Sequence, residues 1–269
     1  MLDKQIQIYA KTFLKDTINK SFSDKEITKI VSKHNLKSHF IPLKYRVAAG
    51  VIQSLNIKFG NFLEEFLRLI ISSSYSEFEL VNEYLSTRKN KFSLRFETDD
   101  LIDKYITKQQ IESQNVLEAF TELKNNITKL ASEPSSNNKL IKHDIDLLFK
   151  NDDKKIIYYV EVKYNDDHDS GKFVDINRKI IKTYAYLEEE FAHKNYKIIP
   201  ILYYFNKGIK SSVNPYLPAD NIMYGPDFFE RFTSIKYADV IEFIQNLSSD
   251  PEITELFDTW LSIIFNGRF

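Results

Sequence analysis

Cysteine is absent from the 269-residue chain, which excludes disulfide bonds and thiolate metal sites and suits a reducing cytoplasm. No apolar run reaches the roughly 18 residues that a membrane-spanning helix needs. The N-terminus "MLDKQIQIYAKTFLKD" lacks the basic and apolar segments of a signal peptide. Glycine and proline are scarce, with 6 and 7 residues, whereas phenylalanine and tyrosine number 21 and 16. This composition predicts a folded chain with a sizeable core.

An excess of charge of one sign is missing as well. The 37 basic and 38 acidic side chains leave a net charge of -1. Such a chain can bind DNA only if its basic side chains gather on one surface. Neither a Gly-rich phosphate loop nor a Gly-x-Ser-x-Gly elbow is present, and the five histidines are scattered without zinc spacing. Nucleotide hydrolysis, serine-hydrolase chemistry and zinc binding are therefore disfavoured.

The predicted elements divide the chain into three parts of one domain, 1–269. Residues 1–135 are mainly helical and include two helical pieces within 45–73, and a Ser- and Asn-rich loop follows at 131–139. The α/β part, 136–235, is followed by C-terminal helices in 236–269. Within the α/β part the patterns predict strands at 141–149 and 155–163, a helix at 173–193, a buried strand at 196–205 and a short strand in "NIMYG". This order predicts an α/β fold with a mixed central sheet flanked by helices and a helical N-terminal region.

Charged side chains lie on the predicted hairpin "HDIDLLFKNDDKKIIYYVEVK" where a buried hairpin favours none. Strand side chains alternate, so Glu161 and Lys163 share one face of the second strand, and Asp144 and Asp146 share one face of the first. Pairing across the turn can bring Asp146 near Glu161. Two buried carboxylates repel each other unless a cation lies between them, and a hard divalent ion with oxygen ligands meets that need. The alternative is a solvated acidic face.

The hairpin resembles the active site of the PD-(D/E)XK nuclease superfamily, in which an Asp on one strand precedes a Glu-x-Lys on the next. "DIDLL" followed by "VEVK" matches this pattern, although the proline before the aspartate is missing. The resemblance implies Mg²⁺-dependent phosphodiester hydrolysis with a restriction-endonuclease-like core. It assigns the metal to Asp146, Glu161 and the carbonyl group of Val162, and the attacking water to Lys163. Asp144 is the competing choice for the aspartate.

A second stretch, "KFGNFLEEFL", precedes the hairpin by about eighty residues. In restriction-endonuclease relatives a helix at this place often carries a Gly-x-x-x-Glu pattern, which Gly60 and Glu64 match. The resemblance therefore adds Glu64 to the catalytic residues. Glu65 lies about 100° further round the helix, so only one of the two glutamates is expected to face the site.

Two groups of basic and amide side chains are candidates for DNA contact, because Arg and Lys bind phosphates and guanine edges and Asn binds adenine. Both could instead be solvated faces. One group follows the hairpin and the other precedes it: Lys172, Asn177, Arg178, Lys179 and Lys182, and Arg88, Lys89 and Lys91 with Arg95.

Over residues 60–235 the chain resembles type II restriction endonucleases, and "SLNIKFGNFLEEF" with "DSGKFVDINRK" is similar to the HinfI-like subgroup. The resemblance implies a prokaryotic cytoplasmic enzyme that cuts double-stranded DNA at a specific sequence, as a homodimer that places one active site on each strand. Two alternatives stay open: a structure-specific repair, recombination or phage-defence nuclease on the same core, or a DNA-binding module without catalysis.

Overall fold

The computed structural model describes residues 2–36, 38–74, 77–85, 91–112, 115–134, 137–142, 144–165, 170–206 and 216–266. The chain forms two compact units, one of Met1–Ile70 with Ile235–Phe269 and one of Ile71–Ser234. Within the described ranges, no helix has the length and apolarity that crossing a bilayer requires. Arg88 and Lys89, two of the predicted DNA contacts, lie outside these ranges.

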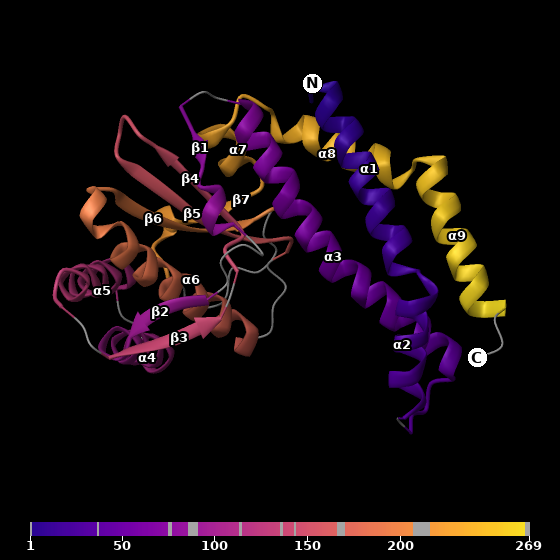
Figure 1. Ribbon diagram of the computed structural model, residues 1–269, viewed down its shortest axis with the longest axis horizontal. Helices are drawn as coiled ribbons and strands as arrows, with labels where there is room; N and C mark the ends of the chain where they lie inside the picture. The colour runs from indigo at the N-terminus through magenta and orange to yellow at the C-terminus, as the bar shows by residue number, and fades with distance from the viewer. Residues whose placement is uncertain are drawn as a thin grey trace. The chain divides into compact units, whose positions relative to one another are not determined.

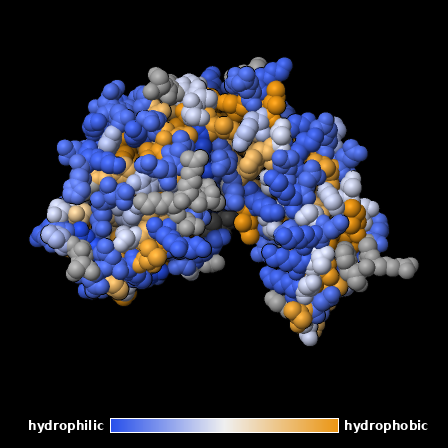
Figure 2. All heavy atoms as spheres, viewed as in Figure 1, coloured by the Kyte–Doolittle hydropathy of each residue, from blue (hydrophilic) through white to orange (hydrophobic). Residues whose placement is uncertain are grey.

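The first unit is helical (Figure 1). Its helices are α1 Lys4–Ser21, α2 Asp24–Asn35, most of α3 Leu43–Ser74, α8 Tyr237–Ser248 and α9 Pro251–Asn266. Buried Ile18, Val51 and Ile253 bring α1, α3 and α9 into one apolar cluster, in which Phe22 stacks on Trp260 with 5.6 Å between ring centroids. Polar residues cover most of the visible surface, with apolar patches among them (Figure 2). Leu36 and Phe40, which follow α2 in the sequence, are exposed apolar residues.

The prediction of two helical pieces within residues 45–73 is wrong, because α3 is one helix of 32 residues. Gly60 lies in its middle, and a Cβ built there would have nothing within 4 Å. A glycine inside a helix costs only about 1 kcal/mol relative to alanine. The buried stripe of Leu63, Phe66, Leu67 and Ile70 outweighs that cost and carries the helix through.

The second unit is built on a mixed sheet in the order β1-β4-β5-β6-β7. The β1–β4 and β4–β5 pairs are antiparallel, and the β5–β6 and β6–β7 pairs are parallel. The strands are β1 Glu79–Leu80, β4 Leu147–Asn151, β5 Ile156–Lys163, β6 Lys197–Tyr204 and β7 Ile222–Tyr224, and the helices are α4 Phe96–Ile111, α5 Val116–Ala131, α6 Ser170–Phe191 and α7 Pro226–Phe232. The predicted α/β fold with a mixed, helix-flanked sheet and a helical N-terminal region is confirmed.

The predicted strand 141–149 is wrong as a single strand. Residues 138–142 form β3, which pairs with β2 Lys91–Arg95 in a separate antiparallel sheet, and residues 147–151 form β4. The pattern of the segment is compatible with a strand throughout. The two halves separate because they find different partners, one about 45 residues upstream and one across the following turn.

Helix α6 lies along one face of the sheet, with α4 and α5 packed against it (Figure 1). Strand residues Ile157 and Tyr159 share a buried cluster with Ile180, Tyr184 and Leu187 of α6. The parallel connection β5–α6–β6 requires such a crossover helix. The chain that follows Lys163 therefore runs, as α6, across the face of the sheet on which Glu161 lies.

Three consecutive glutamates near the end of α6 contact three different elements. Glu188 accepts a hydrogen bond from Thr128 of α5 at 3.3 Å, and Glu189 pairs with Arg95 of β2 at 2.7 Å. Glu190 accepts a hydrogen bond from Tyr84 at 2.6 Å. These contacts fix the far end of α6 to its neighbours on several sides.

The opposite face of the sheet is covered by aromatic side chains, among which Phe232 of α7 is 1% exposed. Its ring centroid lies 4.9 Å from that of Tyr158 and 5.0 Å from that of Phe149. We predict that Phe232→Ala lowers the free energy of unfolding by about 3–5 kcal/mol, because it leaves a cavity among these rings. Urea denaturation measures the loss. The same truncation at fully exposed Phe40 is the control and should cost under about 0.5 kcal/mol; equal losses would contradict the burial of Phe232.

Asp99 of α4 joins α6 to β3, since it pairs with Lys182 and, at 2.9 Å, with Lys139. Burial raises the pKa of this carboxyl group, but the two ammonium groups outweigh burial and hold the pKa below its ordinary value. A lowered pKa in the folded state stabilises the protein above the unfolded-state pKa, and this stabilisation is lost as the pH falls through the folded-state value.

We therefore predict that Asp99→Asn lowers the free energy of unfolding by about 1.5–3 kcal/mol at pH 7. The difference from the parent protein should shrink as the pH falls below about 4, where the parent carboxylate takes up its proton. Denaturation at a series of pH values measures both effects. Asp100→Asn on the same helix, where Asp100 and Lys104 are largely exposed, should change little at any pH. A difference that stays constant with pH would show that the ion pairs contribute nothing.

Candidate active site

Asp146 and Glu161 lie on the same side of the sheet. Strand β4 begins at Leu147, which pairs with Val160, so one further step along the two strands sets residue 146 opposite residue 161. Beyond the last backbone pair of β4 and β5, the Asp146 side chain replaces a backbone acceptor: its Oδ2 accepts a hydrogen bond from the amide of Val162 at 2.9 Å. The local alternation of the strands thus turns both carboxylates toward α6.

Both carboxylates are buried, with Asp146 5% and Glu161 0% exposed. Two lysines contact them. The Nζ of Lys163 lies 2.7 Å from Glu161 Oε1 and 3.6 Å from Asp146 Oδ2. The Nζ of Lys179, from α6, lies 2.8 Å from the same Glu161 oxygen and 3.4 Å from Asp146 Oδ1. We call these four side chains the acidic cluster; since each ammonium group reaches both carboxylates, they belong to one site.

Tyr159 supports the cluster from the same strand, two residues before Glu161. Its hydroxyl donates a hydrogen bond to Glu161 Oε2 at 2.8 Å, and its side chain is fully buried. Burial and the negative charge of Glu161 hold the pKa of this tyrosine well above its ordinary value, so the hydroxyl keeps its proton. Both oxygens of Glu161 are therefore hydrogen-bonded, as a buried carboxylate requires.

The pKa values of the groups in the cluster shift in different directions. Burial raises the pKa of Asp146, and the adjacent charge of Glu161 raises it further. Burial also disfavours ionised Glu161, but Lys163 and Lys179 outweigh it and hold the pKa of Glu161 below its ordinary value. Burial lowers the pKa of Lys179, yet the two carboxylates raise it by more. Glu161 and Lys179 are therefore charged at neutral pH.

The oxygen atoms of the cluster suit a hard divalent cation. Asp146 and Glu161 supply carboxylates, and the carbonyl oxygen of Val162 lies beside them, where it accepts a hydrogen bond from Lys163 at 2.9 Å. In the part of the chain that the structure describes, no three acidic or histidine side chains form a group that could hold a metal ion. Ion binding at the cluster would therefore rest on two carboxylates and a carbonyl, together with water or substrate oxygen.

Asp144 and Glu64 have different surroundings. Asp144 is exposed, and it precedes the strand. Glu64 and Glu65 belong to α3 in the helical unit, where both pair with the buried guanidinium group of Arg68, at 3.6 Å in the case of Glu64. Of the two aspartates that the sequence offered, Asp146 is the one that contacts both lysines.

The predicted DNA contacts of α6 have different surroundings. Lys172 is exposed at the start of the helix, whereas Asn177 is 1% exposed and donates a hydrogen bond to the Phe173 carbonyl oxygen. Arg178 and Lys182 pair with Asp103 of α4, at 3.1 and 3.3 Å. In the second group, Lys91 is exposed on β2.

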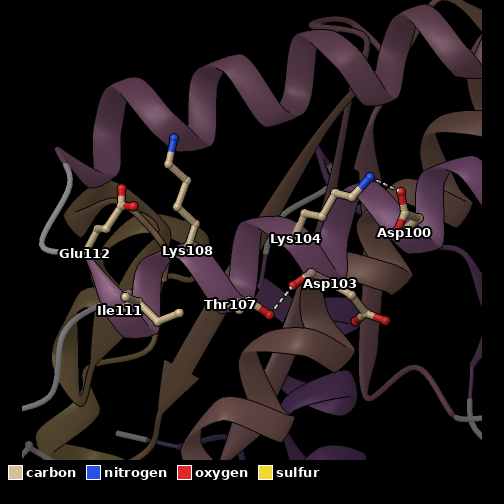
Figure 3. A pocket seen from close by; sticks show the side chains of 7 residues that line it. All are labelled: Asp100, Asp103, Lys104, Thr107, Lys108, Ile111 and Glu112. Carbon is tan, nitrogen blue, oxygen red and sulfur yellow. Dashed lines mark hydrogen bonds and ion pairs between the residues drawn. The ribbon is translucent and has the colours of Figure 1, made fainter.

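Asp103 also lines a shallow pocket on the outer side of α4 (Figure 3). The pocket is lined by residues of this one helix and the residue after it: Asp100, Asp103, Lys104, Thr107, Lys108, Ile111 and Glu112. Several of these groups satisfy one another, as when Lys104 pairs with Asp100 and Thr107 donates to the Asp103 carbonyl oxygen. The pocket shares no residue with the acidic cluster.

Sequence reasoning did not place Lys179 and Tyr159 in the site. Tyr159 could have been found, because it has the same strand parity as Glu161. Lys179 was assigned to DNA contact along with its neighbours, since nothing in a run of basic residues shows which one faces the sheet.

Two comparisons with known proteins bear on the chain as a whole. The family model described as "Type II restriction endonuclease, HinfI" matches residues 2–248. The type II restriction enzyme HinfI of Haemophilus influenzae is 46% identical over 240 residues, which cover 88% of this chain and 89% of that protein. No solved structure matches.

We predict that Tyr159→Phe lowers the free energy of unfolding by about 1.5–3 kcal/mol, because it removes a donor from a buried charged oxygen. Tyr203→Phe on adjacent β6 is the matched control: that tyrosine is equally buried, and its hydroxyl donates to the neutral Gly225 carbonyl at 2.9 Å. The control should cost only about 0.5–1.5 kcal/mol. Denaturant midpoints of the two variants measure the difference, and an equal cost would show that Glu161 gains nothing special from Tyr159.

Proposed function

This chain belongs to the HinfI family of type II restriction endonucleases, and we propose that its acidic cluster is the centre that hydrolyses DNA. The enzyme is a site-specific deoxyribonuclease. The observation that supports our assignment of the centre is the sharing of two ammonium groups by Asp146 and Glu161. Two carboxylates with a common cation can also share a divalent ion.

Type II restriction endonucleases generally use a divalent metal, and we propose Mg²⁺ for this enzyme. Mg²⁺ prefers one or two carboxylates together with water and phosphate oxygens, and the cluster offers that donor set. Asp146, Glu161 and the Val162 carbonyl group would hold the ion. When bound, it would stabilise negative charge on the phosphate oxygens and favour ionisation of a bound water.

We propose that Lys163 acts on the attacking water. Its side chain is 22% exposed, and its ammonium group lies 2.7 Å from Glu161 Oε1. A water held by this donor is oriented toward the phosphorus, and the positive charge favours its hydroxide form. The oxygen of that water forms the new bond to phosphorus as the bond from phosphorus to a sugar oxygen breaks. The proton that the water loses passes to solvent, and the released oxygen takes up a proton from solvent.

DNA contact remains our proposal for the basic residues outside the cluster. Exposed Lys172 and Lys91 are accessible to phosphates, and Arg178 and Lys182 would exchange Asp103 for phosphate oxygens. Arg88 and Lys89 retain the role that the sequence suggests, as does Glu64 as a further active-site acid. A homodimer is proposed on symmetry, since the two strands of a palindromic site need two centres and the assigned cluster supplies one for each chain.

We predict discrete fragments when the purified enzyme is incubated with unmethylated phage DNA and Mg²⁺, and intact DNA when EDTA is present. Asp146→Ala and Lys163→Ala should each slow cleavage by about 100-fold or more, because each removes a group that acts on the reacting atoms. Agarose gels and sequencing of fragment ends measure rate and position.

Asp144→Ala is the control for this experiment. It is the same substitution, Asp to Ala, at an exposed position two residues before Asp146. Its rate should stay within about threefold of the parent enzyme, as is usual for a surface change. Cleavage that survives Asp146→Ala but is lost in Asp144→Ala would transfer the metal-binding role to Asp144.

A further inference from the structure

The acidic cluster sets two lysines against two carboxyl groups. The Nζ atoms of Lys163 and Lys179 each lie 2.7–3.6 Å from oxygens of both Asp146 and Glu161. A divalent ion between the carboxylates would therefore meet two ammonium groups at the same oxygens. The mutual repulsion of three cations on two carboxylates favours the departure of one ammonium group.

The two lysines differ in how firmly they are held. Lys163 belongs to β5 itself, two residues after Glu161, and its side chain is the less exposed of the two at 22%. Lys179 reaches over from α6, and among the described residues its ammonium group contacts only the two carboxylates. Its side chain is 29% exposed, so one side of it is open to solvent. Lys179 is therefore the lysine that an incoming ion can displace.

We propose that Lys179 is a catalytic residue that exchanges partners: its ammonium group neutralises Asp146 and Glu161 in the metal-free enzyme and contacts the scissile phosphate once a divalent ion lies between the carboxylates. This inference rests on the proposed function of the cluster. A flexible four-carbon stem lets the ammonium group turn from one partner to the other without movement of α6.

The arriving DNA supplies the second partner. A phosphate that approaches the ion brings negative charge close to the displaced ammonium group of Lys179. The phosphate can therefore replace the carboxylates as the partner of that group. A positive donor at the phosphate opposes the charge that develops as the bond to the leaving oxygen breaks. Lys179 thus has opposite effects on two steps, because it competes with the ion and assists the reaction.

The first test is binding of Mg²⁺ in the absence of DNA, measured by isothermal titration calorimetry. Lys179→Met removes the charge and keeps a side chain of similar length, so the ion should bind about tenfold more tightly because it no longer displaces a cation. Lys179→Gln should act in the same direction, and thermal melting of both variants reports whether they fold. Lys154→Met, at the exposed far turn of the same hairpin, is the matched control and should bind Mg²⁺ as the parent does.

The second test is cleavage of DNA by the same variants at saturating Mg²⁺. Lys179→Met and Lys179→Gln should cleave about 100-fold more slowly than the parent, although they bind the ion more tightly. Tighter ion binding combined with slower cleavage is a signature that a purely structural lysine would not produce. A lysine that only held the fold together would lower both ion affinity and rate.

Asp146→Asn distinguishes a failure of the role of Lys179 from a failure of the proposed metal site. If the parent binds Mg²⁺ and Asp146→Asn does not, the cluster is a metal site. Ion affinity that is unchanged or weaker in both folded Lys179 variants would then overturn the role of Lys179 alone, as would unchanged cleavage. If Asp146→Asn binds Mg²⁺ as well as the parent, the proposed centre and the role of Lys179 both fail.

Discussion

Two carboxylates buried against two ammonium groups are the constraint on which the second unit depends. An ionised carboxylate out of water costs several kcal/mol unless charge and hydrogen bonds compensate it, and two adjacent carboxylates also repel each other. The compensation comes from separate parts of the chain: Lys163 and the Val162 amide from β5, the Tyr159 hydroxyl from the same strand, and Lys179 from α6. Removal of any one partner leaves charge uncovered, so strand register and helix rotation are fixed together.

The fold explains why these partners meet. Strand β5 lies in the centre of the sheet, and the crossover from β5 to parallel β6 runs through α6, which must lie over one face. That face carries Tyr159 and Glu161. Lys179 contacts the cluster, and Glu188, Glu189 and Glu190 hold the same helix further along. Charged side chains thus make contacts at Lys179 and again at residues 188–190. These contacts fix the rotation of α6 about its own axis more closely than apolar packing alone would. The near-zero net charge of the chain is thus compatible with a site whose charges are concentrated and opposed.

Parts of this arrangement could be predicted from sequence because they depend on local periodicity. Alternation along two strands and a short turn sufficed to bring Asp146 to the side of Glu161, and a continuous apolar run predicted buried β6. Long-range pairing could not be predicted in this way: residues 138–142 leave the hairpin because β2 offers them a partner far upstream. The contact of Lys179 with the carboxylates could not be predicted for a related reason. Its basic neighbours Arg178 and Lys182 lie on the same helix, and the sequence does not show which of the three side chains faces the sheet. The continuity of α3 through Gly60 was missed because burial on α3 outweighs the small cost of one glycine.

The most direct test of the central claim is an experimental structure of the enzyme with DNA and Ca²⁺, an ion of the same charge and ligand preference. Our account predicts one ion about 2.3–2.6 Å from oxygens of both Asp146 and Glu161, near the Val162 carbonyl group and beside a DNA phosphate. An ion bound elsewhere, with the four side chains of the cluster still paired to one another beneath the DNA, would contradict it.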